Sequence, residues 1–327
     1  MAFPFPQMSR RRGSYGQSAF GQAGRRRGGY GTRRGGGLPI RLLIGLAIAA
    51  FSLLSYFFKT DANPITNEKQ RVALADEEDE VRVGLQAAPQ MIEQHQGELG
   101  GRAGQAVDLI GKQLVQAMER DLLDGRPSPY PFEFHLLADA KTVNAFALPG
   151  GQVFITRALY DRLGNAGQLA GVLGHEIGHV IERHGNQRMA EQKRNQGLMS
   201  GVAVASGSYN MANMANLAIN VASKAHGREQ ELESDVWGVD LMPRAGYDPR
   251  ELIEVMNILE AASGGSSGTE FGSTHPSPEN RRQKIEQAIS QLPPGALQQV
   301  DLGMTDASLP PAAASSRGTS LRDLFGG

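Results

Sequence analysis

The chain has 327 residues, a net charge of −1 and no cysteine. This length allows one globular core of about 150–250 residues together with additional segments. The near-zero net charge points to no particular charged partner for the chain as a whole. The absence of cysteine excludes a disulfide framework and leaves the compartment undecided, because a cysteine-free domain is indifferent to redox state.

Positive charge is concentrated at the N-terminus. Residues 1–41 contain nine arginines and no acidic residue. Residues 1–37 have almost no aliphatic side chains, which predicts a disordered basic arm. The tract RRRGGYGTRRGGG is similar to Arg/Gly-rich segments that bind RNA, and Tyr30 could stack on a base. Because an apolar stretch follows, we favour a basic flank attracted to anionic lipid head groups.

The next segment predicts a membrane anchor. Residues 42–58, LLIGLAIAAFSLLSYFF, carry no charge, and residues 38–40 can extend this run if Arg41 snorkels. Arginines precede the run and acidic residues follow it, so the N-terminus is expected in the cytoplasm and the remainder on the periplasmic or extracytoplasmic side. The following sequence, KTDANPITNEK, has no convincing cleavage motif. We therefore expect an uncleaved signal anchor over 38–58 rather than a cleaved signal peptide.

The remainder divides by composition. It predicts an acidic linker over 59–82, a globular domain over 83–292 and a disordered tail over 293–327 that is rich in Pro, Ala, Ser and Gly. Within the domain, alternating apolar residues predict strands in 130–139 and 142–156, the latter folded by a Gly-Gly turn. Helical spacing predicts helices over 103–123, 169–185, 229–245 and 250–261, and closely packed helices over 197–225. The expected class is α+β and mainly helical.

One predicted helix carries a metal-binding pattern. The segment GVLGHEIGHVIERHG, residues 171–185, contains three of the seven histidines of the chain. At about 100° per residue, His175 and His179 face the same way, whereas His184 lies about 180° from His175. His184 is therefore expected to be solvated or to cap the helix. His175-Glu176-x-x-His179 is the H-E-x-x-H pattern of two zinc-binding imidazoles with an adjacent glutamate as general base.

The glycines of this helix indicate that another part of the molecule, or a substrate, packs closely against it. Gly174 and Gly178 each cost about 1 kcal/mol of helix stability relative to alanine. They lie beside the two histidines, so we expect a strand or a substrate to approach the helix there.

A catalytic zinc ion needs a third protein ligand and one open position. The extended pattern H-E-x-x-H-x-x-G-x-x-H is excluded, because Glu182 and Gly185 occupy the positions of its glycine and third histidine. In the later segment REQELESDVWG, Glu231 and Asp235 are four residues apart. Glu231 can bind the metal while Asp235 accepts the free N–H of a ligand histidine. On spacing alone Glu229 and Glu233 remain alternatives, although Glu233 is expected to face solvent.

Four segments in order carry a family resemblance: NAFALPGGQVFITRAL, LAGVLGHEIGHVIERHG, REQELESDVWGVDLMPRAGYDP and STHPSPENRRQKI. Together they resemble the membrane-associated zinc metallopeptidases of the HtpX, CAAX prenyl protease and Oma type, and are most similar to the single-anchor or periplasmic quality-control branch. The resemblance covers about residues 83–290. It implies a gluzincin-type domain with a small β-sheet packed on the H-E-x-x-H helix. It also implies one Zn²⁺ per chain, with Glu231 as third ligand and Asp235 supporting a ligand histidine.

The same resemblance suggests roles outside the metal ligands. The strand formed by Asn144, Ala145, Phe146 and Ala147 would be an edge strand to which an extended peptide adds, the alternative being an ordinary core strand. His275 would stabilise an oxyanion or occupy the open zinc position when substrate is absent. Arg281 would hold a nearby carboxylate or carbonyl. The alternatives are a His-Pro helix cap and a structural ion pair.

A methionine-rich segment is less informative. Met211 and Met214 could form a mobile plug over the cleft, because methionine suits adaptable contacts, or could simply pack within a helix pair.

The sequence thus predicts a membrane-anchored zinc metalloendopeptidase with Glu176 as general base, which degrades unfolded or misassembled envelope polypeptides. Nucleic acid is not an expected partner, and an activating protein partner is left open. Two other functions are retained. One is a metal-stabilised chaperone or scaffold without turnover, against which the presence of Glu176 argues. The other is an RNA-associated membrane protein that acts through the N-terminal Arg/Gly arm.

Overall fold

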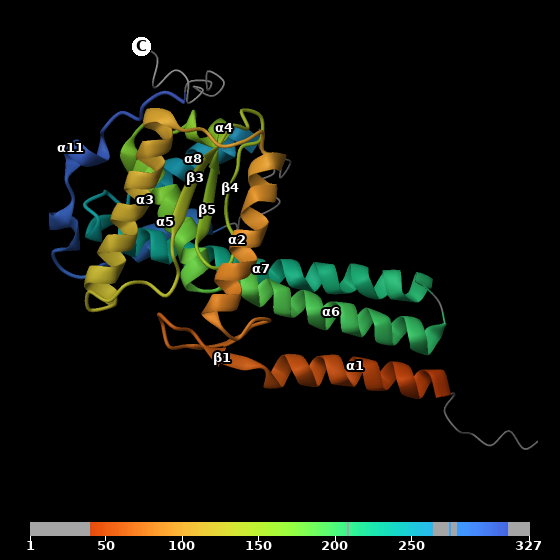
Figure 1. Ribbon diagram of the computed structural model, residues 1–327. Helices are drawn as coiled ribbons and strands as arrows, with labels where there is room; N and C mark the ends of the chain where they lie inside the picture. Colours follow the sequence, from red (N-terminus) through yellow and green to blue (C-terminus); the bar gives the residue numbers. More distant parts are fainter. Residues whose placement is uncertain (1–39, 208, 264–274, 276–279, 313–327) are drawn as a thin grey trace, which may run out of the picture. The chain divides into compact units, whose positions relative to one another are not determined.

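The computed structural model describes residues 40–207, 209–263, 275 and 280–312, and side chains are described outside 209–226 and 263. The predicted basic arm over 1–37 and the methionine side chains of the proposed plug lie outside this part of the chain. Most of the described chain is helical, and two small sheets complete it (Figure 1). The prediction of a mainly helical α+β fold is confirmed.

The helices are α1 (Ile40–Phe58), α2 (Glu77–Gln94), α3 (Gly101–Leu122), α4 (Arg157–Tyr160), α5 (Ala166–Ile181), α6 (His184–Ser206), α7 (Tyr209–Arg244), α8 (Glu251–Ser263), α10 (Arg281–Ser290) and α11 (Leu302–Thr305), with a 3₁₀ turn η1 (Ala296–Gln299). The strands are β1 (Thr60–Ala62), β2 (Lys69–Arg71), β3 (Glu133–Leu137), β4 (Ala145–Ala147) and β5 (Gln152–Thr156).

The main sheet has three strands in the order β3-β5-β4, with β3 parallel and β4 antiparallel to β5. Every residue of β5 is buried, because helices cover both faces. Alternate side chains of the sheet face α3 and α5 on one side and α2 on the other. Leu136 belongs to the large core with α3 and α5, whereas Leu137 packs in the small cluster beside α2. Strand β4 lies at the edge of this sheet.

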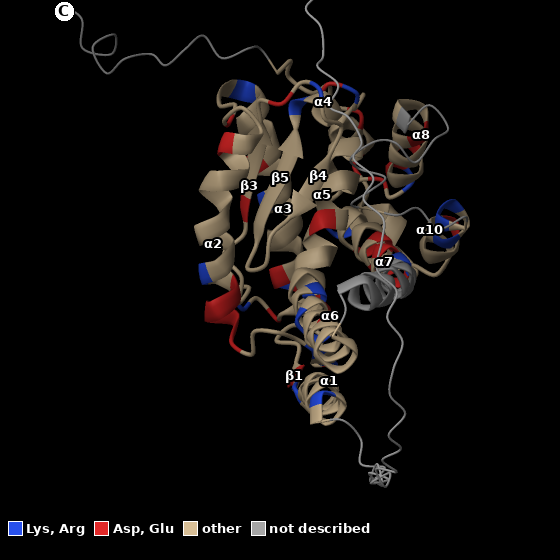
Figure 2. Ribbon diagram, turned by 90° about the vertical axis from the view of Figure 1, so that its right-hand side faces the viewer, with Lys and Arg blue, Asp and Glu red and all other residues tan. Residues whose placement is uncertain are grey.

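The segment predicted as an acidic linker is folded, so that prediction is wrong. Strands β1 and β2 form an antiparallel hairpin, and the side chain of Asn63 accepts hydrogen bonds from two backbone N–H groups in its turn. The acidic run that follows begins α2, and Figure 2 shows this first turn in red at the end of the helix. Negative charge at a helix N-terminus is stabilised by the helix dipole, which composition alone does not reveal.

The domain also extends past its predicted C-terminal boundary. The prediction of a disordered tail from residue 293 is wrong for residues 293–312, which pack on the domain. The hydroxyl of Tyr160 donates to the carbonyl of Pro310 at 2.8 Å, and the N–H of Ala166 donates to the carbonyl of Ala307 at 2.9 Å. Thr305 and Ala312 are buried. These contacts hold the C-terminal segment against the start of α5.

Helix α5 occupies the centre of the domain. Asn165 caps it by accepting a hydrogen bond from the N–H of Gln168 at 2.8 Å. Every residue of α5 except Gln168 is buried, because the sheet, α3, α7 and α8 surround it. The helix ends at Ile181, earlier than the predicted stop at Gly185. Arg183 adopts a left-handed conformation with φ 56° and turns the chain into α6.

Candidate metal centre

Two helices bring the predicted site residues together. His175 and His179 are one turn apart on α5, and Glu231 and Asp235 are one turn apart on α7. His275 and Arg281 reach the same place from the segment before α10 and from its first residue. All six side chains are buried. The structure thus gathers at one point residues that are up to 106 positions apart in the sequence.

The two helices approach closely because glycine lines their contact. A Cβ atom added at Gly178 would lie 2.8 Å from Cβ of Trp237 and 3.0 Å from Cα of Ser234. At Gly174 the nearest atom would be Cα of Gly238 at 3.2 Å. The close neighbour expected from the sequence is therefore helix α7, and not a strand or a substrate.

The substitution Gly178→Ala is expected to destabilise the protein by about 1–3 kcal/mol and to weaken metal binding, because the added methyl group forces α7 away from α5. In a helix without that contact the same change stabilises by about 1 kcal/mol, so the sign of the effect is diagnostic. Urea unfolding and zinc titration measure both quantities. Gly171→Ala is the matched control, since its Cβ would meet the movable Leu252 Cδ1 at 3.3 Å.

Four donor atoms converge between these helices, from His175, His179, Glu231 and His275, all within 4.8 Å of one another. The Nε2 atoms of His175 and His179 are 3.1 Å apart. Carboxylate oxygens of Glu231 lie 3.4 Å from the first and 3.5 Å from the second. Nδ1 of His275 lies 3.4 Å from Nε2 of His175 and 3.0 Å from Glu231 Oε2. Four ligands at about 2.0–2.1 Å from a tetrahedral ion are separated by about 3.3–3.4 Å, so these spacings fit a zinc-sized site.

Asp235 and Arg281 orient the first of these rings. Oδ1 of Asp235 lies 2.9 Å from Nδ1 of His175. Arg281 donates to both oxygens of the same carboxylate, from Nε at 2.6 Å and from Nη2 at 2.8 Å. Burial would raise the pKa of Asp235, but the charge of Arg281 together with the hydrogen bonds from His175 and Arg281 lowers that pKa. An ionised Asp235 accepts the Nδ1–H of His175, which leaves the Nε2 lone pair directed at the centre.

His184 and Glu233 orient the second ring, and the prediction for His184 is wrong. His184 is fully buried, not solvated, and its Nδ1 lies 2.8 Å from Nδ1 of His179. Its Nε2 lies 3.0 Å from Glu233 Oε2, so Glu233 faces solvent, as expected, yet holds His184. If Glu233 accepts the Nε2–H of His184, then Nδ1 of His184 accepts from His179, and the Nε2 lone pair of His179 faces the centre.

The protonation behaviour of these donor groups favours a cation at the centre. Burial and the charge of Arg281 would lower the pKa of His175, but hydrogen bonds to Asp235 and Glu231 raise it to about 9. Burial would likewise raise the pKa of Glu231, yet the charge of His275 and the hydrogen bond from His175 lower it. The buried carboxylates of Asp235 and Glu231 therefore favour positive charge at this centre, whereas burial and the neighbouring His175 lower the pKa of His179. Protons and metal ions compete for the same lone pairs, so a site with this preference also fits a divalent metal.

Glu176 lies beside the donor cluster and differs from it. It is fully buried, and neither of its carboxylate oxygens has a hydrogen-bond partner among the residues that the structure describes. Its Oε1 lies 3.6 Å from Nε2 of His275. Burial raises the pKa of Glu176. A buried carboxylate with a raised pKa and free lone pairs next to a metal site is suited to accept and return a proton.

A cleft of about 130 Å³ reaches this carboxylate, with Glu176, His179 and His275 in its wall. Phe146 and Ala147 of edge strand β4 line it, followed by Leu148 and Pro149. Ala145 is fully buried, and its carbonyl oxygen lies 3.1 Å from Nε2 of His275. Asn144 is also buried and joins β4 to β5, since its carbonyl accepts from the N–H of Thr156. Phe146 and Ala147 are therefore the members of the predicted peptide-binding strand that line the cleft.

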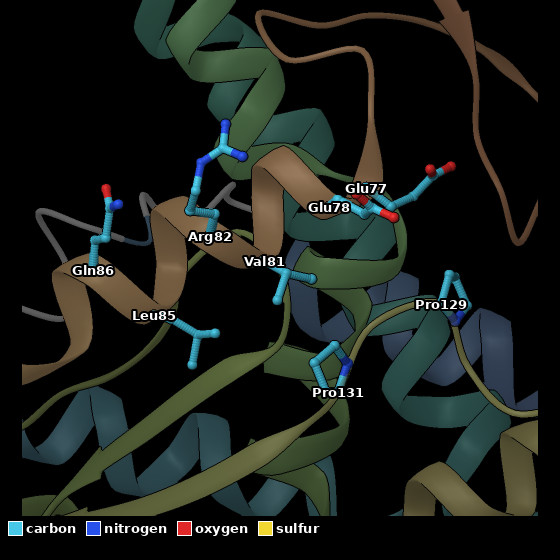
Figure 3. Close-up of a pocket in the computed structure, with 8 residues that line it drawn as sticks. All are labelled: Glu77, Glu78, Val81, Arg82, Leu85, Gln86, Pro129 and Pro131. Atoms are coloured by element: carbon cyan, nitrogen blue, oxygen red, sulfur yellow. The ribbon is translucent and has the colours of Figure 1, made fainter.

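A larger hollow of about 530 Å³ lies elsewhere, between α2 and the segment that precedes β3 (Figure 3). Its wall includes Leu85 and Pro131, with Glu77 and Glu78 at one end. None of the donor residues or Glu176 lines it, so the chemistry of the site belongs to the smaller cleft.

Comparison with known proteins agrees with this geometry. Residues 110–289 match the family described as Peptidase family M48, which is more than half of the chain. The "Beta-barrel assembly-enhancing protease" of Escherichia coli (strain K12) is 30% identical over 221 residues, which are 64% of this chain and 45% of that protein. The "Mitochondrial metalloendopeptidase OMA1" of Saccharomyces cerevisiae is 30% identical over 199 residues, 57% of this chain and 55% of that protein.

A second OMA1, from Schizosaccharomyces pombe, is 29% identical over 177 residues, 53% of this chain and 51% of that protein. The chain thus spans about half the length of the curated relatives that it matches. The family match contains both histidines of α5, the carboxylates of α7, His275 and Arg281. From this match and the donor geometry, we conclude that the chain belongs to peptidase family M48 and is a metallopeptidase.

Proposed function

We propose that this protein is a membrane-anchored zinc-dependent endopeptidase that degrades unfolded or misassembled envelope polypeptides. One observation carries the catalytic part of the proposal. Glu176 is buried without a described hydrogen-bond partner, beside three donor groups whose spacing fits a tetrahedral ion. A metal site that only stabilises a fold has no need of such a carboxylate, so this argues against a catalytically silent scaffold.

His175, His179 and Glu231 would hold the ion, one per chain. When bound, zinc supplies Lewis acidity, which makes water acidic near neutral pH and polarises a peptide carbonyl. Glu176 takes the proton from the attacking water and later delivers it to the leaving amine nitrogen. The raised pKa of Glu176 brings its two protonation states closer in energy, which helps a group that must first accept and then donate.

Strand β4 would hold the substrate. It is the edge strand on the side of the cleft, and Phe146 and Ala147 line that cleft. An extended peptide can pair with its backbone and so place a peptide bond next to Glu176. Because such pairing reads the main chain, it favours broad sequence specificity, in keeping with substrates that are recognised as unfolded.

His275 would act as an inhibitory contact. Its Nδ1 takes the position of a fourth donor, and its Nε2 lies 3.1 Å from the carbonyl of Ala145 on the edge strand. It therefore covers both the open metal position and a backbone group that a peptide would use. This favours the second of its two expected roles, occupation of the open position, over stabilisation of an oxyanion.

The substitution His275→Ala is accordingly expected to increase the rate of casein cleavage by the full-length protein at equal zinc content. Initial rates at saturating and limiting casein measure the effect. A fall of 100-fold or more, of the order seen when an oxyanion donor is removed, would instead assign His275 to transition-state stabilisation.

The cellular setting is the other part of the proposal. Helix α1 is long and apolar enough to cross a membrane, with a mean hydropathy of 2.0. The arginine-rich sequence before it and the acidic residues after it favour a cytoplasmic N-terminus and a catalytic domain on the periplasmic or extracytoplasmic side. A relative is named for enhancing the assembly of β-barrel proteins, which supports envelope polypeptides as the substrate class.

Metal dependence tests the proposal. The full-length protein in detergent is expected to bind one zinc ion and to cleave casein, to lose cleavage on treatment with a chelator, and to regain it with zinc. His179→Ala should lose both metal and cleavage. His135→Ala is the control, because His135 lies on β3 and bonds to Glu98 and Gln152. Zinc binding without cleavage in wild type and in His275→Ala alike would instead indicate a metal-stabilised binding protein.

A further inference from the structure

Most of the surface of helix α1 is apolar and exposed. Gly45 is its only buried residue among those that the structure describes. Large side chains project around it, with exposed fractions of 54% for Leu46, 73% for Phe51 and 54% for Leu54. A helix of 19 residues with this surface is suited to lipid, and the side that carries Gly45 faces helix α6.

The second half of α6 runs antiparallel to α1 along nearly the whole length of α1. Arg41, at the start of α1, lies near Gly207, just after the end of α6. At the other end of the pair, Arg194 of α6 lies over the ring of Tyr56 at 4.5 Å. In Figure 1, α1, α6 and the beginning of α7 run side by side away from the sheet. If α1 crosses a lipid layer, the part of α6 that lies beside it is therefore in the same layer.

The contact between these helices is of a kind that occurs between helices in lipid. A Cβ atom at Gly201 would lie 2.7 Å from the carbonyl oxygen of Gly45 and 3.0 Å from Cβ of Ala49. One turn earlier on α6, Gly197 faces the side chain of Ser52. Small residues four positions apart let two backbones approach closely where water provides no hydrophobic driving force. The two helices thus meet through small residues, and the large apolar side chains of α1 point outward.

The charged residues of α6 are confined to its first half. Its first half contains Arg188, Glu191, Lys193 and Arg194, whereas residues 195–223, which include the rest of α6 and the first part of α7, contain no charged residue at all. The boundary at Arg194 coincides with the end of α1, where Arg194 and Arg71 lie over aromatic rings of Tyr56 and Phe57. Paired cations and aromatic rings are typical of the head-group region of a membrane.

These observations define two levels. One passes through Tyr56 and Arg194, and the other through Arg41 and Gly207. The 13 residues from Asn195 to Gly207 extend about 20 Å as a helix. A hydrocarbon core is about 30 Å thick, so this uncharged segment would reach only part of the way across it, with local thinning and snorkelling of flanking cations such as Arg41 covering the difference.

We propose that the uncharged half of α6, residues 195–207, inserts into the same lipid layer as α1 and contacts acyl chains. This inference rests on the membrane span of α1 proposed above. The chain would then be held in the membrane by α6 as well as by α1. Because His184, which contacts His179, lies only ten residues or about 15 Å before Arg194 on α6, the metal centre would sit close to the membrane surface. Its substrates would be polypeptide segments that emerge from the lipid.

Single cysteines test the position of α6 directly, because the chain has no cysteine of its own. Ser200→Cys lies on the exposed side of α6 in the uncharged half, and Gln192→Cys is the matched control on the charged half of the same helix. Leu46→Cys reports on α1 alone. Each full-length variant is spin-labelled and placed in vesicles of phosphatidylethanolamine and phosphatidylglycerol. Collision rates with oxygen, which concentrates in lipid, and with a water-soluble nickel complex are then measured.

The expected result is that labels at positions 46 and 200 collide several-fold more with oxygen than with nickel, while the label at position 192 shows the reverse. A label at 200 that behaves like that at 192, with 46 still in lipid, overturns the inference and leaves the single anchor intact. A label at 200 shielded from both probes also overturns it, because that site is then covered by protein. Exposure of position 46 to nickel would contradict the proposed anchor itself.

Discussion

Replacing Glu176 with glutamine is expected to abolish casein cleavage, by a factor of about 10²–10⁴ or more, while the zinc content stays at that of the wild type. The donor atoms that converge on the centre belong to other residues, so an amide at position 176 leaves the metal site intact. The amide has no lone pair basic enough to take a proton from water. Atomic absorption and initial cleavage rates on the same preparation measure the two quantities.

Glu182→Gln is the matched control for this experiment. Glu182 is also a buried glutamate, one residue past the end of α5, but it accepts hydrogen bonds from Trp237 at 2.7 Å and from Gln70 at 2.9 Å. Its substitution should keep cleavage within a few-fold of wild type. If Glu176→Gln retained activity, the general base would have to be another group. If Glu176→Gln lost zinc as well as activity, position 176 would be part of the metal site.

The local pattern of α5 explains why its two histidines could be identified from the sequence. A period of 3.6 residues fixes which side chains of one helix share a face, so His175 and His179 follow from spacing alone. The same arithmetic failed for His184, because it assumed that the helix continues. The turn at Arg183 breaks the helix and returns His184 beneath His179. A residue in the left-handed conformation that is neither glycine nor asparagine leaves little signal in a sequence.

Contacts between distant residues explain the other differences. Glu80 belongs to an acidic run whose composition indicates a solvated linker, yet it is 1% exposed. It is buried because Arg183 donates to it at 2.7 Å from 103 residues away. The spacing of Glu231 and Asp235 made them the best candidates but left Glu229 and Glu233 open, because spacing does not state which face of α7 meets α5. The family resemblance decided between them. Propensity and periodicity describe single elements, and the pairing of elements is decided by packing.

The pair formed by Arg183 and Glu80 leads to a prediction on stability. Arg183 is buried and also donates to Asp61 at 2.9 Å and to the carbonyl of Leu74 at 3.2 Å. It thereby ties the hairpin after the anchor and the first turn of α2 to the end of the metal-binding helix. Replacing it with methionine keeps an apolar stem of similar length but leaves the carboxylate of Glu80 buried without its cation.

Arg183→Met is expected to lower the free energy of unfolding by about 3–5 kcal/mol at neutral pH, the usual range when one partner of a buried ion pair is removed. The double variant Arg183→Met with Glu80→Gln should lose less than the single variant, because no buried charge is then left unpaired. Urea unfolding of all three proteins, followed by circular dichroism, gives the two differences.

The pH dependence distinguishes this cause from a simple loss of packing. Burial raises the pKa of Glu80 above its usual value of 4.5 even though Arg183 opposes the shift, and removal of Arg183 raises it further. A carboxyl group with a raised pKa in the folded state favours folding when it is protonated, and this contribution is lost as pH rises through the folded pKa. The deficit of Arg183→Met relative to wild type should therefore shrink as pH falls toward 4.5 and grow toward neutrality. A deficit that is independent of pH would assign the effect to the backbone turn at position 183 instead of to the buried charge.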